Sequence, residues 1–122
     1  MQELAPVLIT GGSGLIGSAI TEALTHDRIP VRWYSRQKLQ PSSGVQVFEW
    51  NPANGSADAA ALTGVETIIH LAGAGIADER WSPARKALII NSRVQAANSL
   101  FELLRTHTHQ VKTIVAASAV GY

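Results

Sequence analysis

The sequence predicts an α/β fold in three layers, with a central parallel sheet of five strands in the order 3-2-1-4-5. Short apolar segments alternate with segments of helical periodicity, which requires parallel strands joined by right-handed crossovers. The first apolar segment is continuous rather than alternating, as in a strand that is buried on both faces. Glycine and alanine follow the first and fourth apolar segments, so small residues stand at the carboxyl ends of two strands.

Length and composition limit the chain to one small domain. Its 122 residues are 46% hydrophobic and 16% charged, which excludes a disordered chain. The net charge of +1, without a basic run, argues against nucleic acid and membrane surfaces as partners. There are no cysteines, and no apolar run approaches the ~20 residues of a membrane span. We therefore expect one cytoplasmic domain over residues 1–122.

The first half of the chain predicts three strands and one helix. The first strand runs from Pro6 to Thr10, and the next two are Val31–Ser35 and Val45–Trp50. Residues 37–44 contain proline, serine and glycine and predict a loop, so the regular helix between the second and third strands is missing. The helix after the first strand should be amphipathic and end before Asp27. Its apolar face comprises Leu15, Ile16, Ala19, Ile20, Ala23 and Leu24, and its polar face Ser18, Thr21 and Glu22.

The second half predicts a short helix, a long helix and two strands. Residues 51–55 form a turn, and Asp58 should cap a short helix that ends at Thr63 and Gly64. The fourth and fifth strands are Thr67–Leu71 and Val111–Ala117. Between them, a long helix should begin with Ser82 as N-cap and Pro83 in the first turn, and end near Arg105. Its apolar face comprises Ile90, Val94, Ala97, Phe101 and Leu104.

No helix is predicted after the fifth strand, which would leave the sheet truncated there. Either the sequence is a fragment or something else covers this strand. The segment from Ile114 to Val120 is apolar and uncharged, and an exposed edge of this kind favours pairing with another chain. We therefore expect self-association through the exposed edge strand.

The glycine-rich segment after the first strand is the main functional signal. It contains both G-x-G-x-x-G and T-G-x-x-G-x-x-G between a strand and a helix, the context of a Rossmann dinucleotide-binding unit. Glycines permit a tight turn and close approach of a pyrophosphate, and the helix N-terminus offers free N–H groups. A turn that binds nothing is the alternative, but four glycines in seven residues cost much chain entropy. The expected cofactor-binding residues are Thr10, Gly11, Gly12, Ser13, Gly14, Leu15, Ile16 and Gly17.

The end of the second strand predicts which cofactor is bound. An NAD site carries Asp or Glu there for the ribose hydroxyls, whereas an NADP site lacks the acid and favours arginine. This chain reads Ser35-Arg36-Gln37-Lys38, without an acid, which favours NADP (NADPH) over NAD. The alternative is that Arg36 and Lys38 are solvated loop charges.

Several segments together resemble a known family. They are T-G-G-S-G-L-I-G from Thr10, Phe48–Pro52, Ile69–Ile76, Arg80–Ser82, Asn91–Val94 and Ser118–Tyr122. They resemble the extended short-chain dehydrogenase/reductases, and more narrowly the atypical NADP-binding, nucleoside-diphosphate-sugar-epimerase-like branch. The resemblance covers nearly the whole chain, but it corresponds only to the N-terminal portion of a family member.

The resemblance implies where the adenosine half of the cofactor would lie. Gly11, Gly14 and Gly17 would hold the pyrophosphate. Ser35 and Arg36 would face the 2′-phosphate. Trp50 or Asn51 would lie near the adenine.

For the nicotinamide half, the resemblance implies two further contacts. Leu71, Ala72 and Gly73 would pass under the nicotinamide ribose. Ser92 and Arg93 would point toward the cofactor from the long helix.

The implied function is NADP(H) binding in an epimerase/dehydratase-like oxidoreductase of unknown substrate. A full-length member would take a sugar-nucleotide-like substrate. The family uses Ser or Thr after the fifth strand and a later Y-x-x-x-K pair. This chain has Ala119 at the first position, and its Tyr34 and Lys38 have the spacing of the pair but lie at the second strand, so they are not that pair. The catalytic residues therefore remain unknown, and a non-catalytic dinucleotide-binding or sensor module is the alternative.

Other polar residues give weaker signals. His70 could assist a proton transfer, but a histidine at the edge of the core that is satisfied by the backbone is the simpler interpretation. His107 and His109 lack a third ligand, so no metal site is predicted. Ser13 and Ser118 lack a His–Asp arrangement, which disfavours hydrolase chemistry. The basic residues around the long helix start, Arg80, Arg85 and Lys86 with Trp81, either cover a substrate anion or form a capped helix start.

Overall fold

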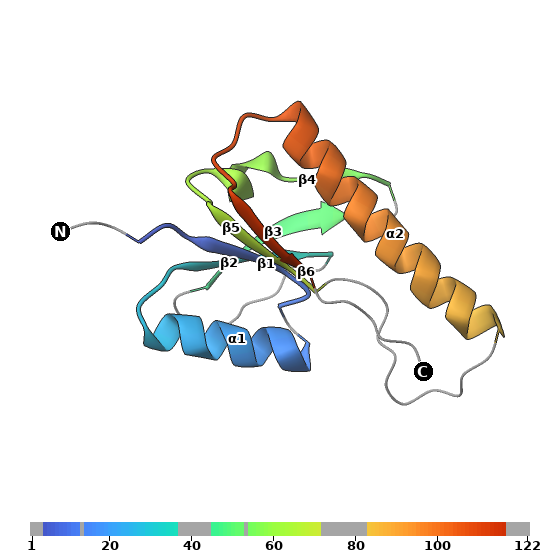
Figure 1. Ribbon diagram of the computed structural model, residues 1–122, viewed down its shortest axis with the longest axis horizontal. Helices are drawn as coiled ribbons and strands as arrows, with labels where there is room; N and C mark the ends of the chain where they lie inside the picture. The colour runs from blue at the N-terminus through green and yellow to red at the C-terminus, as the bar shows by residue number, and fades with distance from the viewer. Residues whose placement is uncertain (1–3, 13, 37–44, 53, 72–82, 117–122) are drawn as a thin grey trace.

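The computed structural model describes residues 4–12, 14–36, 45–52, 54–71 and 83–116, with the backbone alone for residues 83–90, 92 and 93. Within these ranges the elements follow each other in the predicted alternation (Figure 1). They are β1 (Val7–Thr10), α1 (Leu15–His26), β2 (Val31–Ser35), β3 (Val45–Asn51), β4 (Ser56–Ala57), η1 (Ala59–Leu62), β5 (Thr67–His70), α2 (Pro83–Thr106) and β6 (Thr113–Ala116).

The strands form one sheet in the order β4-β3-β2-β1-β5-β6. The five predicted strands are parallel neighbours in the predicted order, which confirms the α/β fold. The two-residue strand β4 is an addition that the sequence did not predict, and it runs antiparallel to β3. The turn predicted at residues 51–55 makes this hairpin, in which the Asn54 N–H donates to the Asn51 carbonyl at 3.2 Å and Gly55 has a φ of +75°.

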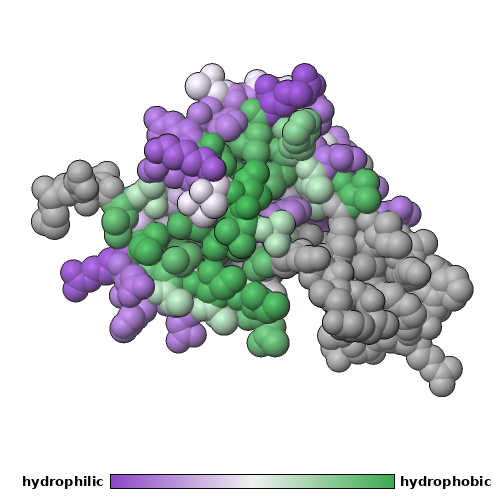
Figure 2. Space-filling model, in the orientation of Figure 1, coloured by the Kyte–Doolittle hydropathy of each residue, from purple (hydrophilic) through white to green (hydrophobic). Residues whose placement is uncertain are grey.

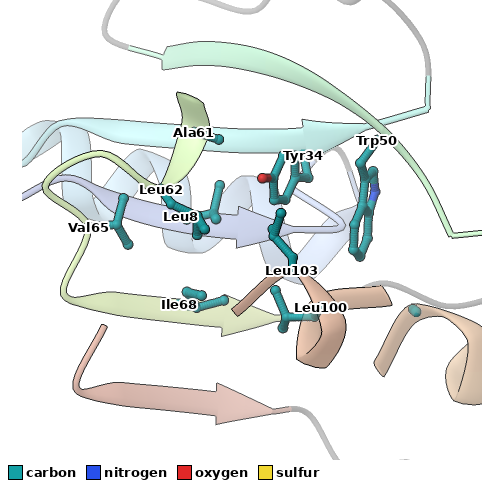
Figure 3. Packing of buried hydrophobic residues seen from close by; sticks show 10 residues of the cluster. Leu8, Tyr34, Trp50, Ala61, Leu62, Val65, Ile68, Leu100 and Leu103 are labelled. Atoms are coloured by element: carbon teal, nitrogen blue, oxygen red, sulfur yellow. The ribbon is translucent and has the colours of Figure 1, made fainter. Parts of the chain in front are cut away.

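Helices cover both faces of the sheet, so the molecule has three layers (Figure 1). On the α1 face, Ile20 and Leu24 pack against a small cluster of Ile9, Val31 and Trp33. The larger cluster lies on the α2 face (Figure 3). Its buried members are Leu8, Tyr34, Trp50, Ala61, Leu62, Val65, Ile68, Ala96, Leu100 and Leu103.

The prediction for the buried face of α1 was partly wrong. Leu15 and Ile16 are 90% and 62% exposed, whereas Thr21, which was assigned to the polar face, is 7% exposed. The physical reason is that Thr21 is hydrogen-bonded to two buried neighbours, so its hydroxyl is satisfied inside the protein. Helical spacing identifies residues that share one face of a helix, but it does not identify the neighbouring residues against which that face packs.

The prediction for the apolar face of α2 was also wrong in part. Val94 and Phe101 are 51% and 65% exposed, whereas Ala96, Leu100 and Leu103 are buried against the sheet. Both rows have helical spacing, so periodicity alone does not choose between them. The predicted helix end near Arg105 is confirmed, while Ser82 lies outside the described residues and the side chain of Ile90 is not described.

The short element between β4 and β5 agrees with its prediction. Asp58 caps it by accepting a hydrogen bond from the Ala60 N–H at 3.0 Å, and Gly64 has a φ of +77°. The element is a 3₁₀ turn rather than an α-helix. Arg32 fastens it to β2, because its Nη1 donates to the carbonyls of Ala61 and Thr63 at 3.0 and 2.6 Å.

Candidate functional site

Three parallel strands end together at one edge of the sheet. In the register of the sheet, Thr10 of β1 lies opposite Tyr34 of β2 and opposite His70 of β5. The glycine-rich segment leaves this edge from β1 and leads into α1. In open parallel sheets, ligands bind outside the carboxyl ends of the strands where the order reverses, and β1 stands at that position here.

The glycine turn is closed by its own backbone. Gly11 has a φ of +79°, which favours glycine, and its carbonyl accepts a hydrogen bond from the Gly14 N–H at 3.2 Å. Gly14 is the N-cap of α1, and its carbonyl accepts the first helical bond from the Ser18 N–H at 2.8 Å. No side chain of the described residues caps this helix end. Its first N–H groups are therefore suited to binding an anion.

Each glycine of the turn has a different steric surrounding. A Cβ on Gly17 would lie 2.3 Å from the Gly11 carbonyl oxygen, so this residue permits helix and turn to touch. A Cβ on Gly12 would lie 2.3 Å from Nε1 of Trp33, so this glycine accommodates an indole. At Gly14 the nearest atom would be 3.5 Å away, in ordinary contact, and the residue is exposed. The fold requires Gly12 and Gly17, whereas Gly14 leaves open the side from which a ligand can approach.

A hydrogen-bonded group joins β1 to β5 beside the turn. The hydroxyl of Thr10 lies 2.7 Å from Nδ1 of His70, and it accepts a hydrogen bond from the Leu71 N–H at 3.0 Å. The same N–H also lies 2.9 Å from the Thr10 carbonyl oxygen. The simpler interpretation of His70 expected a backbone partner, whereas the structure places the Thr10 hydroxyl beside its Nδ1.

A groove at the ends of β2 and β3 forms the second part of the site. It has a volume of about 680 Å³ and is lined by Arg36, Val47, Phe48, Glu49, Trp50, Asn51, Asn54, Ser56, Ala57 and Asp58. Trp50 stacks on Tyr34, with ring centroids 5.1 Å apart and an interplanar angle of 10° (Figure 3). The Tyr34 hydroxyl donates to the Asp58 carbonyl at 2.7 Å. Burial, together with the nearby Asp58 charge, raises the pKa of Tyr34 above its usual value.

The structure brings some of the predicted site residues together and says nothing of others. Arg36, Trp50 and Asn51 line the same groove, and Ser35 pairs with Glu49 in the sheet. Leu15 and Ile16 lie in the first turn of α1 with exposed side chains. Ser92 and Arg93 lie in α2, but their side chains are not described. Several predicted residues fall outside the described ranges: Ser13, Lys38, Ala72, Gly73, Arg80, Trp81, Ser118 and Ala119.

Sequence reasoning missed four residues at this site. Trp33 contacts the glycine turn and is hydrogen-bonded to Thr21, and Glu49 and Asp58 are acidic residues in the lining of the groove. The strand pattern offered one signal, because alternation along β2 places Trp33 on the same face as the helix that follows the turn. For Glu49 and Asp58 the sequence offered no such signal, because both lie far along the chain from the end of β2, where the cofactor preference was predicted.

Among the described residues, no group of three or more His, Cys, Asp or Glu side chains could hold a metal ion. No helix in the same part of the chain combines the length and the apolar character needed to cross a membrane.

Comparison with known sequences gives a consistent family. A family model described as the NAD dependent epimerase/dehydratase family matches residues 7–122. An epimerase family protein of Mycobacterium bovis is 40% identical over 118 residues, covering 97% of this chain. Another from Staphylococcus saprophyticus is 34% identical over 116 residues, covering 94% of this chain. The chain spans 38% of the length of each of these curated relatives.

Solved structures share the fold. The nucleoside-diphosphate sugar epimerase from Corynebacterium glutamicum has a TM-score of 0.70 and 32% identity, over 98% of this chain and 23% of that chain. Human epimerase family protein SDR39U1, solved with NADPH, has a TM-score of 0.69 and 25% identity, over 94% and 37%. MoeE5, in complex with UDP-glucuronic acid and NAD, has a TM-score of 0.71 and 25% identity, over 93% and 36%.

Proposed function

Because this chain belongs to the NAD dependent epimerase/dehydratase family, we propose that it binds NADP(H) as the cofactor domain of an epimerase/dehydratase-like oxidoreductase. The observation that carries the proposal is the glycine turn at the start of α1. Gly14 stands exposed at the N-cap, and a Cβ there would meet nothing closer than 3.5 Å. A pyrophosphate is the anion that such a turn fits, because backbone N–H groups and the helix dipole both favour negative charge.

The two parts of the site would hold two parts of the cofactor. The turn at residues 10–17 would bind the pyrophosphate, and the groove beside Trp50 and Asn51 would bind the adenosine. The groove is large enough for a nucleoside and is lined by polar side chains and the half-buried Phe48, whereas the Trp50 ring beside it is only 4% exposed. Leu71, bonded to Thr10 at the end of β5, would lie on the path toward the nicotinamide. When bound, the cofactor supplies hydride chemistry.

NADPH is the proposed cofactor because Arg36 lines the groove at the end of β2. A guanidinium there suits a 2′-phosphate, and β2 carries no acid at its end. Relatives with this fold were solved with NADPH in one case and with NAD in another. Glu49 and Asp58 line the same groove, and their negative charges would repel a 2′-phosphate. The preference for NADPH therefore requires that the phosphate bind nearer to Arg36 than to these two acids.

The reaction and the substrate are proposals for a whole protein. MoeE5 was solved with UDP-glucuronic acid, so a sugar nucleotide is the substrate class that we propose. This chain has Ala119 after the fifth strand, where the resemblance implies Ser or Thr, and its Y-x-x-x-K spacing, from Tyr34 to Lys38, begins in β2 rather than after that strand. Ala119 favours a second candidate function, a non-catalytic dinucleotide-binding module. Two observations discriminate between the candidates: NADPH oxidation with a panel of sugar nucleotides, and the coding sequence that follows codon 122.

Calorimetric titration with NADPH tests the proposal directly. The wild-type chain should bind NADPH, and Gly14→Ala should weaken binding about 10-fold, a loss of about 1.4 kcal/mol. The added methyl group has space within the protein but would occupy the approach to the turn. Ala23→Ser, at an exposed position of the same helix, is the matched control and should bind as the wild type does. If the wild-type chain does not bind NADPH or NADH, the proposed function is wrong.

A further inference from the structure

A buried chain of two hydrogen bonds connects β2 to the glycine turn through α1. The indole Nε1–H of Trp33 donates to the Thr21 hydroxyl at 3.0 Å. That hydroxyl in turn donates to the Gly17 carbonyl at 2.7 Å. Trp33 is 8% exposed and Thr21 is 7% exposed, so water competes little for either bond. Each donor in this chain has its acceptor, as a buried polar group requires.

The same indole touches the turn itself. A Cβ on Gly12 would lie 2.3, 2.4 and 2.5 Å from three atoms of the Trp33 ring, so the ring lies directly against the Gly12 backbone. Gly17 also lies so close to the turn that a Cβ would meet the Gly11 carbonyl oxygen at 2.3 Å. The turn therefore contacts both the indole and the first turn of α1, and the Thr21 hydroxyl is hydrogen-bonded to both of them.

Thr21 is unusual for its position. Among the described residues, only Thr10 and Thr21 are buried and polar. An apolar side chain at position 21 would leave the indole N–H buried without this acceptor. Threonine bonding back to the carbonyl four residues earlier is common in helices, but a second bond from an indole fixes the ring against the turn.

We infer that Trp33 and Thr21 are positioning residues for pyrophosphate binding at the glycine turn. This inference rests on the proposed function. Neither side chain reaches the ligand, since both are buried beneath the turn. Their effect passes through the backbone of Gly12 and Gly17, whose placement sets the direction of the N–H groups at the start of α1. A shift of that backbone weakens bonds to a pyrophosphate but does not reach a nucleoside in the groove beside Trp50.

The test compares ADP with adenosine, because only ADP has the pyrophosphate. Thr21→Val keeps the shape and loses the hydroxyl, and Trp33→Phe keeps an aromatic ring and loses the N–H. Both should bind ADP about 10-fold more weakly than the wild type, with adenosine affinity unchanged. Thr21→Ser keeps the hydroxyl and should restore ADP affinity. Thr25→Val is the matched control, because Thr25 bonds to the Glu22 carbonyl one turn further along α1.

The outcomes separate this inference from the proposed function. ADP affinity that is unchanged in Thr21→Val overturns the inference while the proposed function stands. Equal losses for ADP and adenosine also overturn it, because general destabilisation would then explain the result. If the wild-type chain binds neither ADP nor NADPH, both proposals are wrong. Should Thr21→Val fail to fold, as judged by its melting curve, Trp33→Phe decides the question by the same comparison.

Discussion

The Thr10 hydroxyl lies 2.7 Å from Nδ1 of His70, although sixty residues separate the two in the sequence. The hydroxyl also accepts the Leu71 N–H, so one side chain of β1 holds the residues at the end of β5. Thr10 is fully buried, and it stands where the glycine turn begins. The contact therefore connects the turn to the strand on the nicotinamide side of the proposed site.

Removing this hydroxyl should destabilise the fold. Thr10→Val keeps the shape of the side chain but leaves the two partners without this bond, which should lower the free energy of unfolding by about 1–3 kcal/mol. Urea denaturation followed by circular dichroism measures the difference. Thr10→Ser retains the hydroxyl and should lose less. A Thr10→Val midpoint equal to that of the wild type would show that the bond contributes nothing.

Arg36 should determine the cofactor preference. A charge-assisted hydrogen bond contributes about 1.5–3 kcal/mol, so NADPH should bind about 10- to 150-fold more tightly than NADH. Arg36→Ala should erase most of this difference and leave NADH binding nearly unchanged. Calorimetric titrations with both cofactors measure it. Lys38 should leave a residual preference that fades as salt increases. Equal wild-type affinities would show that Arg36 is only a solvated charge.

Glu49 provides a further control for the same experiment. Because it lines the groove with Arg36, its carboxylate should repel a 2′-phosphate. Glu49→Gln should therefore increase the preference for NADPH, in the direction opposite to that of Arg36→Ala. A preference that does not change would place Glu49 away from the bound phosphate.

Gly12 and Trp33 should show energetic coupling. Gly12→Ala forces a methyl group into the indole and should cost about 1–3 kcal/mol of folding free energy. In a Trp33→Leu background the methyl group has space, so the same change should cost about 1 kcal/mol less. A double-mutant cycle in urea measures this coupling. Gly14→Ala, without a close neighbour, is the control. Strictly additive effects would contradict the contact.

Tyr34 should make the fold less stable at alkaline pH. Its pKa is raised in the folded protein, first by burial and then by Asp58, so the folded state holds the proton more tightly than the unfolded chain. Stability is therefore complete below the unfolded pKa of about 10 and falls as pH rises above it. Between pH 9 and pH 11, wild-type stability should fall by about 1 kcal/mol more than that of Tyr34→Phe. Urea titrations at both pH values measure the difference, and parallel curves would contradict it.

The edge strand β6 should promote self-association. All four of its residues are exposed, with Ile114 and Val115 at 48% and 53%, and hydrophobic residues gather on the face where this strand lies (Figure 2). An apolar edge of this kind invites pairing with a second chain. Light scattering should show an average mass that rises with concentration, and Val115→Lys should reduce the rise. A wild-type chain that stays monomeric at high concentration would contradict the prediction.

The sequence alone was sufficient for the order of the five parallel strands and their helices and for the family. Continuous apolar segments, glycines after the first of them and a capped turn at Asp58 are local signals, and each acts through the backbone conformation of its own neighbours. For the same reason, the glycine turn could be found without coordinates. The antiparallel strand β4 could not be predicted, because a strand of two residues produces no periodicity in the sequence.

Only the tertiary structure decided which side of each helix is buried and which partners meet. Along α2, the row of Val94 and Phe101 and the row of Ala96, Leu100 and Leu103 have the same helical spacing. The sheet covers only the second row, and the sequence of the helix does not predict which of the two rows is buried. Thr21 can be buried because Trp33, which belongs to β2, donates a hydrogen bond from its indole N–H to the Thr21 hydroxyl. Burial of a polar group is favourable only when its partner is present, and the partner is brought there by the fold rather than by the neighbouring sequence.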